Sequence, residues 1–270
     1  MKPQTESGLE VRFTGKTAYI TGGGSGIGRA TAIAFAAEGA AVTIVDIDAQ
    51  GADGTADAIE KLGGKCLVIE GNISSSEVVD NSIKETIKKL GGLDFVFNNA
   101  GCEYVAPLLE TTDAQWDEVV DTNLKGTFMV ARQAAEHMVR TGFGVIINNA
   151  SDAGLRGIRL NAAYSTSKAG IIHLTKSIAL DYGHAGVRCN CICPGCIKTP
   201  LCERFNKEVG ARKGKSGEEV LDAFVKANIP MMRVGMPEEV ASVVLFLCSD
   251  DARYVSGATI PIDGGLTAGM

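Results

Sequence analysis

A chain of 270 residues with 45% hydrophobic and 21% charged residues is long enough to bury a large core and is unlike a disordered chain. Its formal net charge of -6 argues against a nucleic-acid-binding protein, which usually presents a basic surface. The N-terminal sequence MKPQTESGLE has no apolar leader, and no apolar run reaches the ~18 residues of a membrane span, so we expect a reducing, cytoplasmic location for the eight cysteines.

Short apolar runs alternate with amphipathic stretches along the chain. Strands are predicted at 17–21, 41–47, 66–70, 93–98, 144–149, 187–193 and 258–262. Helices are predicted between them at 27–38, 51–62, 76–90, 116–140, 162–182 and 237–249. Because strands that alternate with helices form right-handed βαβ units, the sequence predicts a single α/β domain. The expected architecture is a three-layer Rossmann fold, with a doubly wound parallel sheet between two layers of helices.

One segment, at about 198–228, departs from this alternation. It carries many charges and follows the carboxyl end of a predicted strand, where ligands bind in this architecture. Long irregular segments at such places often close over a ligand, so we expect a substrate lid. The alternative is a solvated excursion that does not touch the substrate.

A glycine-rich loop, TGGGSGIG from Thr21 to Gly28, lies between the first predicted strand and the first predicted helix. Glycines let a backbone approach a pyrophosphate, and the helix N-terminus offers free N–H groups. At the first βα turn this pattern indicates a dinucleotide site, whereas elsewhere it could be a tight turn only. The loop residues expected to contact the dinucleotide are Gly22, Ser25, Gly26, Ile27 and Gly28.

An acidic residue, Asp46, ends the second predicted strand, 18 positions after the last glycine of the loop. A carboxylate there can accept hydrogen bonds from the adenosine ribose and repel the 2′-phosphate of NADP. Ser25 and Ile47 are neutral, and Arg29 is expected to point to solvent. The sequence therefore predicts NAD as the cofactor, with Asp48 as an alternative ribose-binding carboxylate.

Five further motifs come after the glycine loop in a fixed order. They are NNAG at 98–101, DTNLKG around Asn123, Ser151 followed by YSTSK at 164–168, CPGCIKT at 193–199 and IDGG at 262–265. In this order and spacing, the chain resembles the short-chain dehydrogenase/reductase family from about Gly15 to Gly265. Two features depart from the family pattern: Asn72 stands where Asp is common, and an Asn148-Asn149 pair precedes Ala150.

Tyr164 and Lys168 are four residues apart, which places them on one face of the predicted helix. A free tyrosine titrates near ~10. A neighbouring ammonium and a cationic oxidised nicotinamide are both expected to lower the pKa of Tyr164, so that the phenol exchanges a proton with the substrate. Ser151 is expected to hold the substrate oxygen. Alone, such a Tyr-Lys spacing indicates only an exposed helix face.

The resemblance implies further roles. Lys168 would also bond the nicotinamide ribose, and Asn123 would anchor a water chain from Lys168 to solvent; alternatively, Asn123 only bridges backbone groups. Ile197 and Thr199 would bond the carboxamide, although Thr199 can also cap a helix beside Pro200. The cofactor contacts outside the glycine loop are expected at Asp46, Ile47, Asn72, Ile73, Asn99, Ala100, Gly101, Tyr164, Lys168, Pro194, Gly195, Ile197 and Thr199.

The pattern of the cysteines indicates side chains packed in the core more than a metal site or a reactive site. Cys189, Cys191 and Cys193 alternate along a predicted strand and so share one face, where small side chains fill space in a sheet. With Cys196 they could instead form a soft-metal site, but a strand is too regular to wrap a tetrahedral ion, so we predict no metal. Cys102 and Cys196 each follow a cofactor motif and are expected near the substrate cleft.

The expected function is hydride transfer between NAD(H) and a secondary alcohol or ketone, such as a steroid, cyclic alcohol or polyol. A 3-oxoacyl-thioester reductase is the nearest alternative, although that activity usually goes with NADPH. A non-catalytic scaffold is a remote alternative because the catalytic set is complete. A serine hydrolase is disfavoured because the chain lacks the last glycine of the hydrolase motif around Ser25.

The expected partners are a small, partly apolar substrate and other copies of the chain in a homotetramer, with no nucleic acid and no membrane. The apolar lid candidates are Leu201, Phe205, Met231 and Met232.

Overall fold

Seven parallel strands form a single sheet in the computed structural model, which describes residues 11–269. The strand order is β3-β2-β1-β4-β5-β6-β7, which reverses direction between β1 and β4 and confirms the doubly wound sheet. The N-terminal segment in which we expect no leader lies outside the described residues. The strand bounds are β1 (Thr17–Thr21), β2 (Ala41–Asp46), β3 (Cys66–Glu70), β4 (Phe95–Asn98), β5 (Gly144–Asn149), β6 (Val187–Pro194) and β7 (Thr259–Ile262).

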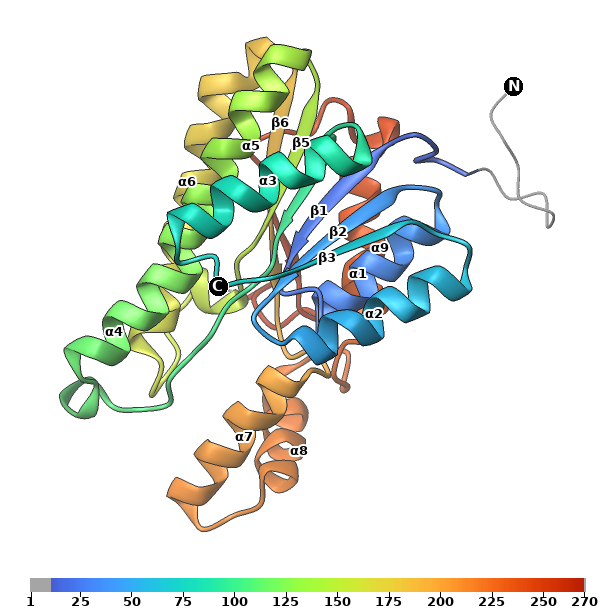
Figure 1. Cartoon of the computed structure of the whole chain (residues 1–270). Coiled ribbons are helices and arrows are strands. Elements are labelled where there is room, and N and C mark those ends of the chain that lie inside the picture. Colours follow the sequence, from blue (N-terminus) through green and yellow to red (C-terminus); the bar gives the residue numbers. More distant parts are fainter. Residues whose placement is uncertain (1–10, 270) are drawn as a thin grey trace.

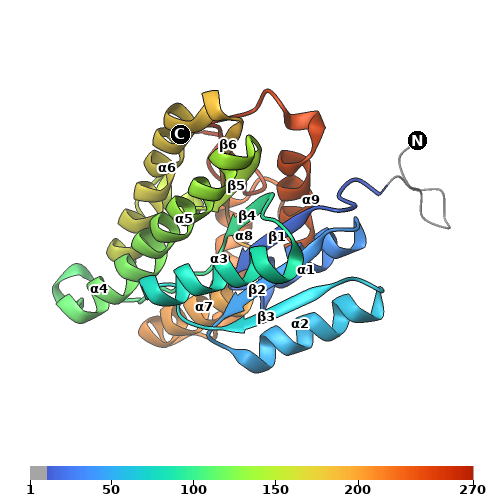
Figure 2. The ribbon, with the colours of Figure 1, turned by 45° about the horizontal axis from the view of Figure 1, so that its top comes forward.

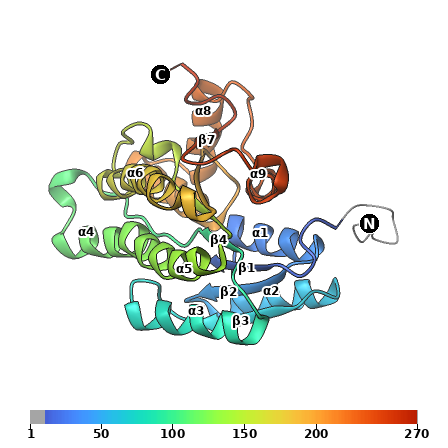
Figure 3. The same ribbon diagram turned by 90° about the horizontal axis from the view of Figure 1, so that it is seen from above.

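Helices cover both faces of this sheet (Figures 1 and 3). One layer contains α1 (Gly26–Ala37), α2 (Ala49–Lys61) and α9 (Pro237–Cys248), and the other contains α3 (Ser76–Leu90), α5 (Thr127–Thr141) and α6 (Ala162–Tyr182). Each layer has its own apolar core against the sheet. Among the described helices, none is long and apolar enough to cross a membrane.

The central strands are buried on both faces, as parallel strands between two helical layers must be. All residues of β1 and β5 are buried, which explains why both read as uninterrupted runs rather than as an alternating pattern. The predicted bounds of α3 are confirmed at both ends. Ser75 caps its N-terminus by accepting a hydrogen bond from the Val78 amide, and Gly91, with φ of 90°, ends it in the left-handed region.

The helix predicted at 116–140 is confirmed as a helical segment, but it is not a uniform α-helix. The chain instead forms α4 (Asp113–Val120), a π-helical turn at Asp121–Gly126, and then α5. The π turn inserts an extra residue into the helical ladder and rotates α5 relative to α4. As a result Asn123, in the middle of this turn, faces inward and is completely buried.

The prediction of an irregular segment at about 198–228 is wrong, because this part of the chain is helical. It forms a hairpin of α7 (Pro200–Lys213) and α8 (Gly217–Asn228), which projects beyond the carboxyl ends of the strands (Figure 1) and lies behind the sheet in the view of Figure 2. Thr199 caps α7 by accepting a hydrogen bond from the Cys202 amide at 3.2 Å, so the predicted N-cap is confirmed. The charged side chains of α7 obscure its helical period in the sequence, whereas α8 has a clear apolar face.

Candidate active site

A large cleft opens at the carboxyl ends of the strands, between the sheet and the α7–α8 hairpin. Its volume is about 1380 Å³. That exceeds the ~300–1,000 Å³ of common small-molecule pockets, so it has room for a dinucleotide and a substrate together. Segments from the whole length of the chain meet here, from the glycine loop near Gly22 to Leu266.

The residues predicted to bind the dinucleotide or to act in catalysis line this cleft, with two exceptions, Gly28 and Asn123. Those that line it are Gly22, Ser25, Gly26, Ile27, Asp46, Ile47, Asn72, Ile73, Asn99, Ala100, Gly101, Ser151, Tyr164, Lys168, Pro194, Gly195, Ile197 and Thr199. The two exceptions lie directly behind the lining, where each supports a segment that does face the cleft.

The glycine loop has the shape that a pyrophosphate needs. Gly28 packs so closely beneath the loop that a Cβ there would lie 2.0 Å from the Gly22 carbonyl oxygen. Gly22 and Gly26 have φ of 66° and 52°, in the left-handed region that favours glycine. Ser25 is the N-cap of α1 but makes no side-chain capping bond, so the first-turn amides of α1 keep their donors for an anion.

Asp46 holds its carboxylate at the cleft beside this loop. Its Oδ2 accepts a hydrogen bond from the Gly24 amide at 2.8 Å, and its Oδ1 accepts one from the Asp48 amide at 3.0 Å. The next residue, Ile47, is 72% exposed and also lines the cleft. Arg29 is not part of the lining, because its guanidinium extends over Gly54 of α2. A negative charge therefore stands at this end of the cleft with no cation against it in the lining.

Asn72, the departure expected near adenine, is exposed and lies at the rim of the cleft. Its Oδ1 accepts a hydrogen bond from the Ser74 amide at 2.9 Å. This leaves the side-chain amide nitrogen as the group that can meet a ligand. An aspartate in the same place would offer only acceptors.

The second departure, the Asn148-Asn149 pair, belongs to a network of asparagines at the ends of β4 and β5. The side chain of Asn98 donates to Asn148 at 2.8 Å, and that of Asn149 donates to Asn99 at 2.9 Å. The backbone carbonyl of Asn149 accepts a hydrogen bond from Lys168 Nζ at 2.7 Å. The pair therefore ties together the two strands and the lysine that flank the catalytic position.

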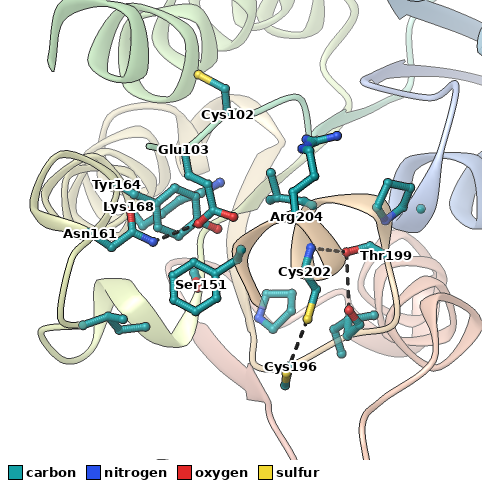
Figure 4. A pocket seen from close by; sticks show the side chains of 18 of the residues that line it. Cys102, Glu103, Ser151, Asn161, Tyr164, Lys168, Cys196, Thr199, Cys202 and Arg204 are labelled. Atoms are coloured by element: carbon teal, nitrogen blue, oxygen red, sulfur yellow. Dashed lines mark hydrogen bonds between the residues drawn. The ribbon is translucent and has the colours of Figure 1, made fainter. Parts of the chain in front are cut away.

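Tyr164 and Lys168 lie on successive turns of α6 and both face the cleft (Figure 4). The Lys168 ammonium nitrogen is 5.4 Å from the centre of the Tyr164 ring. Ser151 lies at the end of β5, where its Oγ donates to Asp152 at 3.1 Å and accepts from the Ala153 amide at 3.1 Å. The three groups expected to carry the chemistry are thus brought together by α6 and β5.

The protein groups around Tyr164 act against the expected lowering of its pKa, and the effect of the oxidised nicotinamide stays a prediction. Burial raises the pKa of Tyr164, the negative charge of Glu103 raises it further, and the Ser151 hydroxyl acts in the opposite direction. Burial also lowers the pKa of Lys168 to about 8, which still leaves its ammonium mostly protonated at neutral pH. The phenol therefore favours its neutral form here.

Glu103 is a cleft residue that none of the sequence motifs identified. Its carboxylate accepts a hydrogen bond from the Asn161 side chain at 2.8 Å, and Figure 4 shows it beside Tyr164 and Lys168. Burial raises its pKa to about 7, with the charge of Glu208 acting in the same direction. The available signal was its position two residues after the NNAG motif, at the carboxyl end of β4.

Asn123 acts from behind the lining. Its Oδ1 accepts a hydrogen bond from the Cys102 amide at 2.9 Å, and its Nδ2 donates to the Cys102 carbonyl at 2.9 Å and to Ser167 at 3.1 Å. These bonds use the donors of the side-chain amide. The side chain therefore fixes the loop after β4 against α6, and its water chain to Lys168 stays a prediction.

The cysteines divide into two groups. Cys189, Cys191 and Cys193 are fully buried along β6, as expected for side chains that fill the sheet. Within residues 11–269, no group of three or more His, Cys, Asp or Glu side chains has the arrangement of a metal site. Cys102 and Cys196 line the cleft, as their positions after two motifs indicated.

Of the four apolar residues expected in the lid, two line the cleft and two do not. Leu201 and Phe205, on the first turns of α7, line the cleft. Met231 and Met232 do not belong to the lining and are 58% and 60% exposed. The prediction for the two methionines is therefore not supported, because they follow α8 in the chain and turn away from the cleft.

Comparisons with known proteins identify the family of this chain. A family model described as enoyl-(acyl carrier protein) reductase matches residues 22–267. Levodione reductase of Leifsonia aquatica is 38% identical over 260 residues, covering 95% of this chain and 96% of that protein. The 3-oxoacyl-[acyl-carrier-protein] reductase FabG of Thermotoga maritima is 37% identical over 256 residues, covering 95% of this chain and 99% of FabG.

Solved structures give the same result. A crystal structure of levodione reductase superimposes with a TM-score of 0.92 at 37% identity, covering 96% of this chain and 100% of the other. A crystal structure of NAD⁺-bound xylitol dehydrogenase superimposes with a TM-score of 0.88 at 31% identity, covering 94% and 99%. The chain therefore belongs to the short-chain dehydrogenase/reductase family of oxidoreductases.

Proposed function

We propose that this protein is an NAD(H)-dependent oxidoreductase that interconverts a secondary alcohol and its ketone. The observation that carries the proposal is the cleft itself. It presents Tyr164 and Lys168, one helical turn apart, at one end, and the glycine loop with Asp46 at the other. A dinucleotide bound along the cleft would extend from Asp46 to the Tyr164 hydroxyl.

Different residues of the cleft bind the cofactor, hold the substrate and transfer the proton. The first-turn amides of α1 bind the pyrophosphate, and Asp46 accepts the adenosine ribose hydroxyls. Tyr164 takes the proton of the substrate hydroxyl during oxidation and returns it during reduction, while Ser151 holds the same oxygen. Lys168, fixed by the Asn149 carbonyl, orients the nicotinamide ribose. When bound, the nicotinamide supplies or accepts the hydride, and its oxidised form adds a positive charge beside the phenol.

We also propose that the α7–α8 hairpin is the substrate lid. Leu201 and Phe205 present apolar surface to the cleft, and Arg204 comes from the same helix. A lid with these side chains excludes water from the reacting groups. It suits a substrate that combines an apolar frame with a few oxygen atoms.

The substrate class rests on this lining and on what the relatives are named for. Levodione reductase and xylitol dehydrogenase are named for a diketone and a polyol. FabG, at nearly the same identity, is named for a 3-oxoacyl thioester, so a thioester reductase is the second candidate. Asp46 favours the first class, because 3-oxoacyl-thioester reductases usually use NADPH, and a carboxylate at this position would repel the 2′-phosphate of that cofactor.

A substrate panel tests the proposal. We expect the purified protein to reduce NAD⁺ with at least one cyclic, steroid or polyol secondary alcohol, or to oxidise NADH with the matching ketone. An acetoacetyl thioester with NADPH serves as the comparison. Turnover of the thioester alone would favour the second candidate, and no turnover across the panel with either cofactor would contradict the proposed function.

The raised pKa of Glu103 leads to a pH-dependent prediction for Glu103→Gln. Ionised Glu103 raises the pKa of Tyr164, so removing the carboxylate should lower that pKa and shift the rise of alcohol oxidation to lower pH. Since Glu103 itself titrates at about 7, it is protonated and neutral below that pH. The profiles of variant and wild type should therefore converge below about pH 7 and separate above it.

The measurement is kcat/KM for alcohol oxidation from acid to alkaline pH. Glu136→Gln is the matched control, because Glu136 pairs with Arg140 on the exposed face of α5 and does not line the cleft. Its profile should follow the wild type. A Glu103→Gln profile that superimposes on the wild type, or moves to higher pH, would show that this carboxylate does not act on the phenol.

A further inference from the structure

Two thiols meet where the cleft wall joins the lid. Cys196 lies in the loop after β6, and Cys202 lies in the first turn of α7. Their sulfur atoms are 3.4 Å apart, and both side chains are partly buried and line the cleft (Figure 4). Hydride transfer as described above uses neither of them. Nothing about packing alone requires two thiols in contact at the edge of a solvent-filled cleft.

The surroundings make the two thiols unequal. Cys202 Sγ shares a hydrogen bond with Cys196 Sγ and accepts a second one, at 3.4 Å, from Nδ2 of the buried Asn206, a donor that Cys196 does not have within the described part of the chain. The contact with Cys196 lowers the pKa of Cys202 although burial opposes it, whereas the same contact, together with burial, raises the pKa of Cys196. Cys202 is therefore the more acidic of the two thiols and Cys196 the less acidic one.

We propose that Cys196 and Cys202 form a redox-active dithiol that low-molecular-weight disulfides oxidise. Cys202 gives its proton to solvent, and its thiolate attacks one sulfur of the disulfide, forming a mixed disulfide and releasing one thiolate, which takes the Cys196 proton. Cys196 then attacks the Cys202 sulfur, forming the internal disulfide and releasing the second thiolate, which takes a proton from solvent. The protein loses two electrons and two protons, and the external disulfide becomes two thiols.

The geometry allows the second step with little movement. A disulfide needs its sulfurs about 2.05 Å apart, so two sulfurs already in contact require a side-chain rotation rather than a rearrangement of the fold. On one side, the Cys196 carbonyl accepts a hydrogen bond from the Gly235 amide at 2.9 Å, which anchors the loop. On the other, Cys202 is held in the helix by its bond to Thr199.

The bond would close a short ring around Thr199 and Pro200. It would tie the start of α7 to the anchored loop, in the segment that we assign to the nicotinamide carboxamide and to the lid. Formation of the disulfide does not depend on the proposed function, but its effect on turnover rests on it. We expect oxidation to lower turnover reversibly, because the hairpin loses freedom to move against the cleft.

Mass spectrometry of the full chain after treatment with oxidised glutathione tests the site. The wild type should lose two hydrogen atoms in mass, with the peptides of Cys196 and Cys202 joined, and a reducing agent should reverse this. Cys196→Ser should stop at one glutathione on Cys202. Cys202→Ser should react roughly tenfold or more slowly, because the remaining thiol is the less nucleophilic one. Cys66→Ser, which removes a partly buried thiol outside the cleft, should behave as the wild type.

Two results would overturn the inference. One is a wild-type protein that keeps both thiols free, or forms its cross-link through another cysteine, while its circular dichroism matches the untreated protein. The other is oxidised protein whose turnover equals that of the reduced protein. Because the mass shift is read without any substrate, a protein that forms the bond yet lacks dehydrogenase activity would contradict the proposed function and not the dithiol.

Discussion

Replacing Tyr164 by phenylalanine should lower kcat by ~10²–10⁴ or more, the usual contribution of a positioned acid/base. The substitution removes only the hydroxyl and keeps the ring against Lys168, so the fold and the cofactor site should be preserved. Burial and Glu103 hold the hydroxyl in its neutral form, which makes it the proton donor for reduction and, once deprotonated, the acceptor for oxidation. Steady-state turnover in both directions, with NADH binding followed by fluorescence, measures the effect.

The matched control is Tyr182→Phe, which makes the same substitution at the last residue of the same helix, on an exposed side chain. It should turn over as the wild type does. Turnover of Tyr164→Phe within a few-fold of the wild type would reject the assignment. Loss of NADH binding along with activity would show that Tyr164 has a structural role instead.

Replacing Asp46 by alanine should weaken the preference for NAD over NADP. The carboxylate is proposed to accept charge-assisted hydrogen bonds from the ribose, each about 1.5–3 kcal/mol, so kcat/KM with NAD⁺ should fall roughly 10–100-fold. The repulsion of a 2′-phosphate disappears at the same time, so kcat/KM with NADP⁺ should rise. The ratio of the two kcat/KM values is the quantity to follow.

Asp48→Ala is the control for this experiment, since Asp48 is the alternative ribose-binding carboxylate in the sequence. In the structure it caps α2, accepting a hydrogen bond from the Gly51 amide at 3.1 Å, and it does not line the cleft. Its removal should cost about 0.5–2 kcal/mol of stability without changing the cofactor ratio. A ratio that changes with Asp48 and not with Asp46 would reverse the assignment.

Local patterns account for the features that could be predicted. The glycine loop at the first βα turn and the one-turn spacing of Tyr164 and Lys168 involve residues close together in the sequence, so their geometry follows from helix and strand periodicity. The π turn around Asn123 was missed because the hydrophobic pattern continues across it. The first helix of the hairpin, α7, was missed because its charged, exposed faces hide the helical period, whereas the apolar face of α8 could have been recognised.

The sequence by itself determined the alternation of strands and helices, the position of the glycine loop and the acidic residue on which the proposal of NAD rests, all of which depend on short-range order. Only the tertiary structure decided the electrostatics of the phenol. Glu103 and its partner Asn161 are 58 residues apart and meet through the packing of the loop after β4 against the N-terminus of α6. The same folding buries Lys168 and brings Cys196 against Cys202. A pKa or a thiol contact depends on desolvation and on neighbours distant in the chain, and neither is encoded in local periodicity.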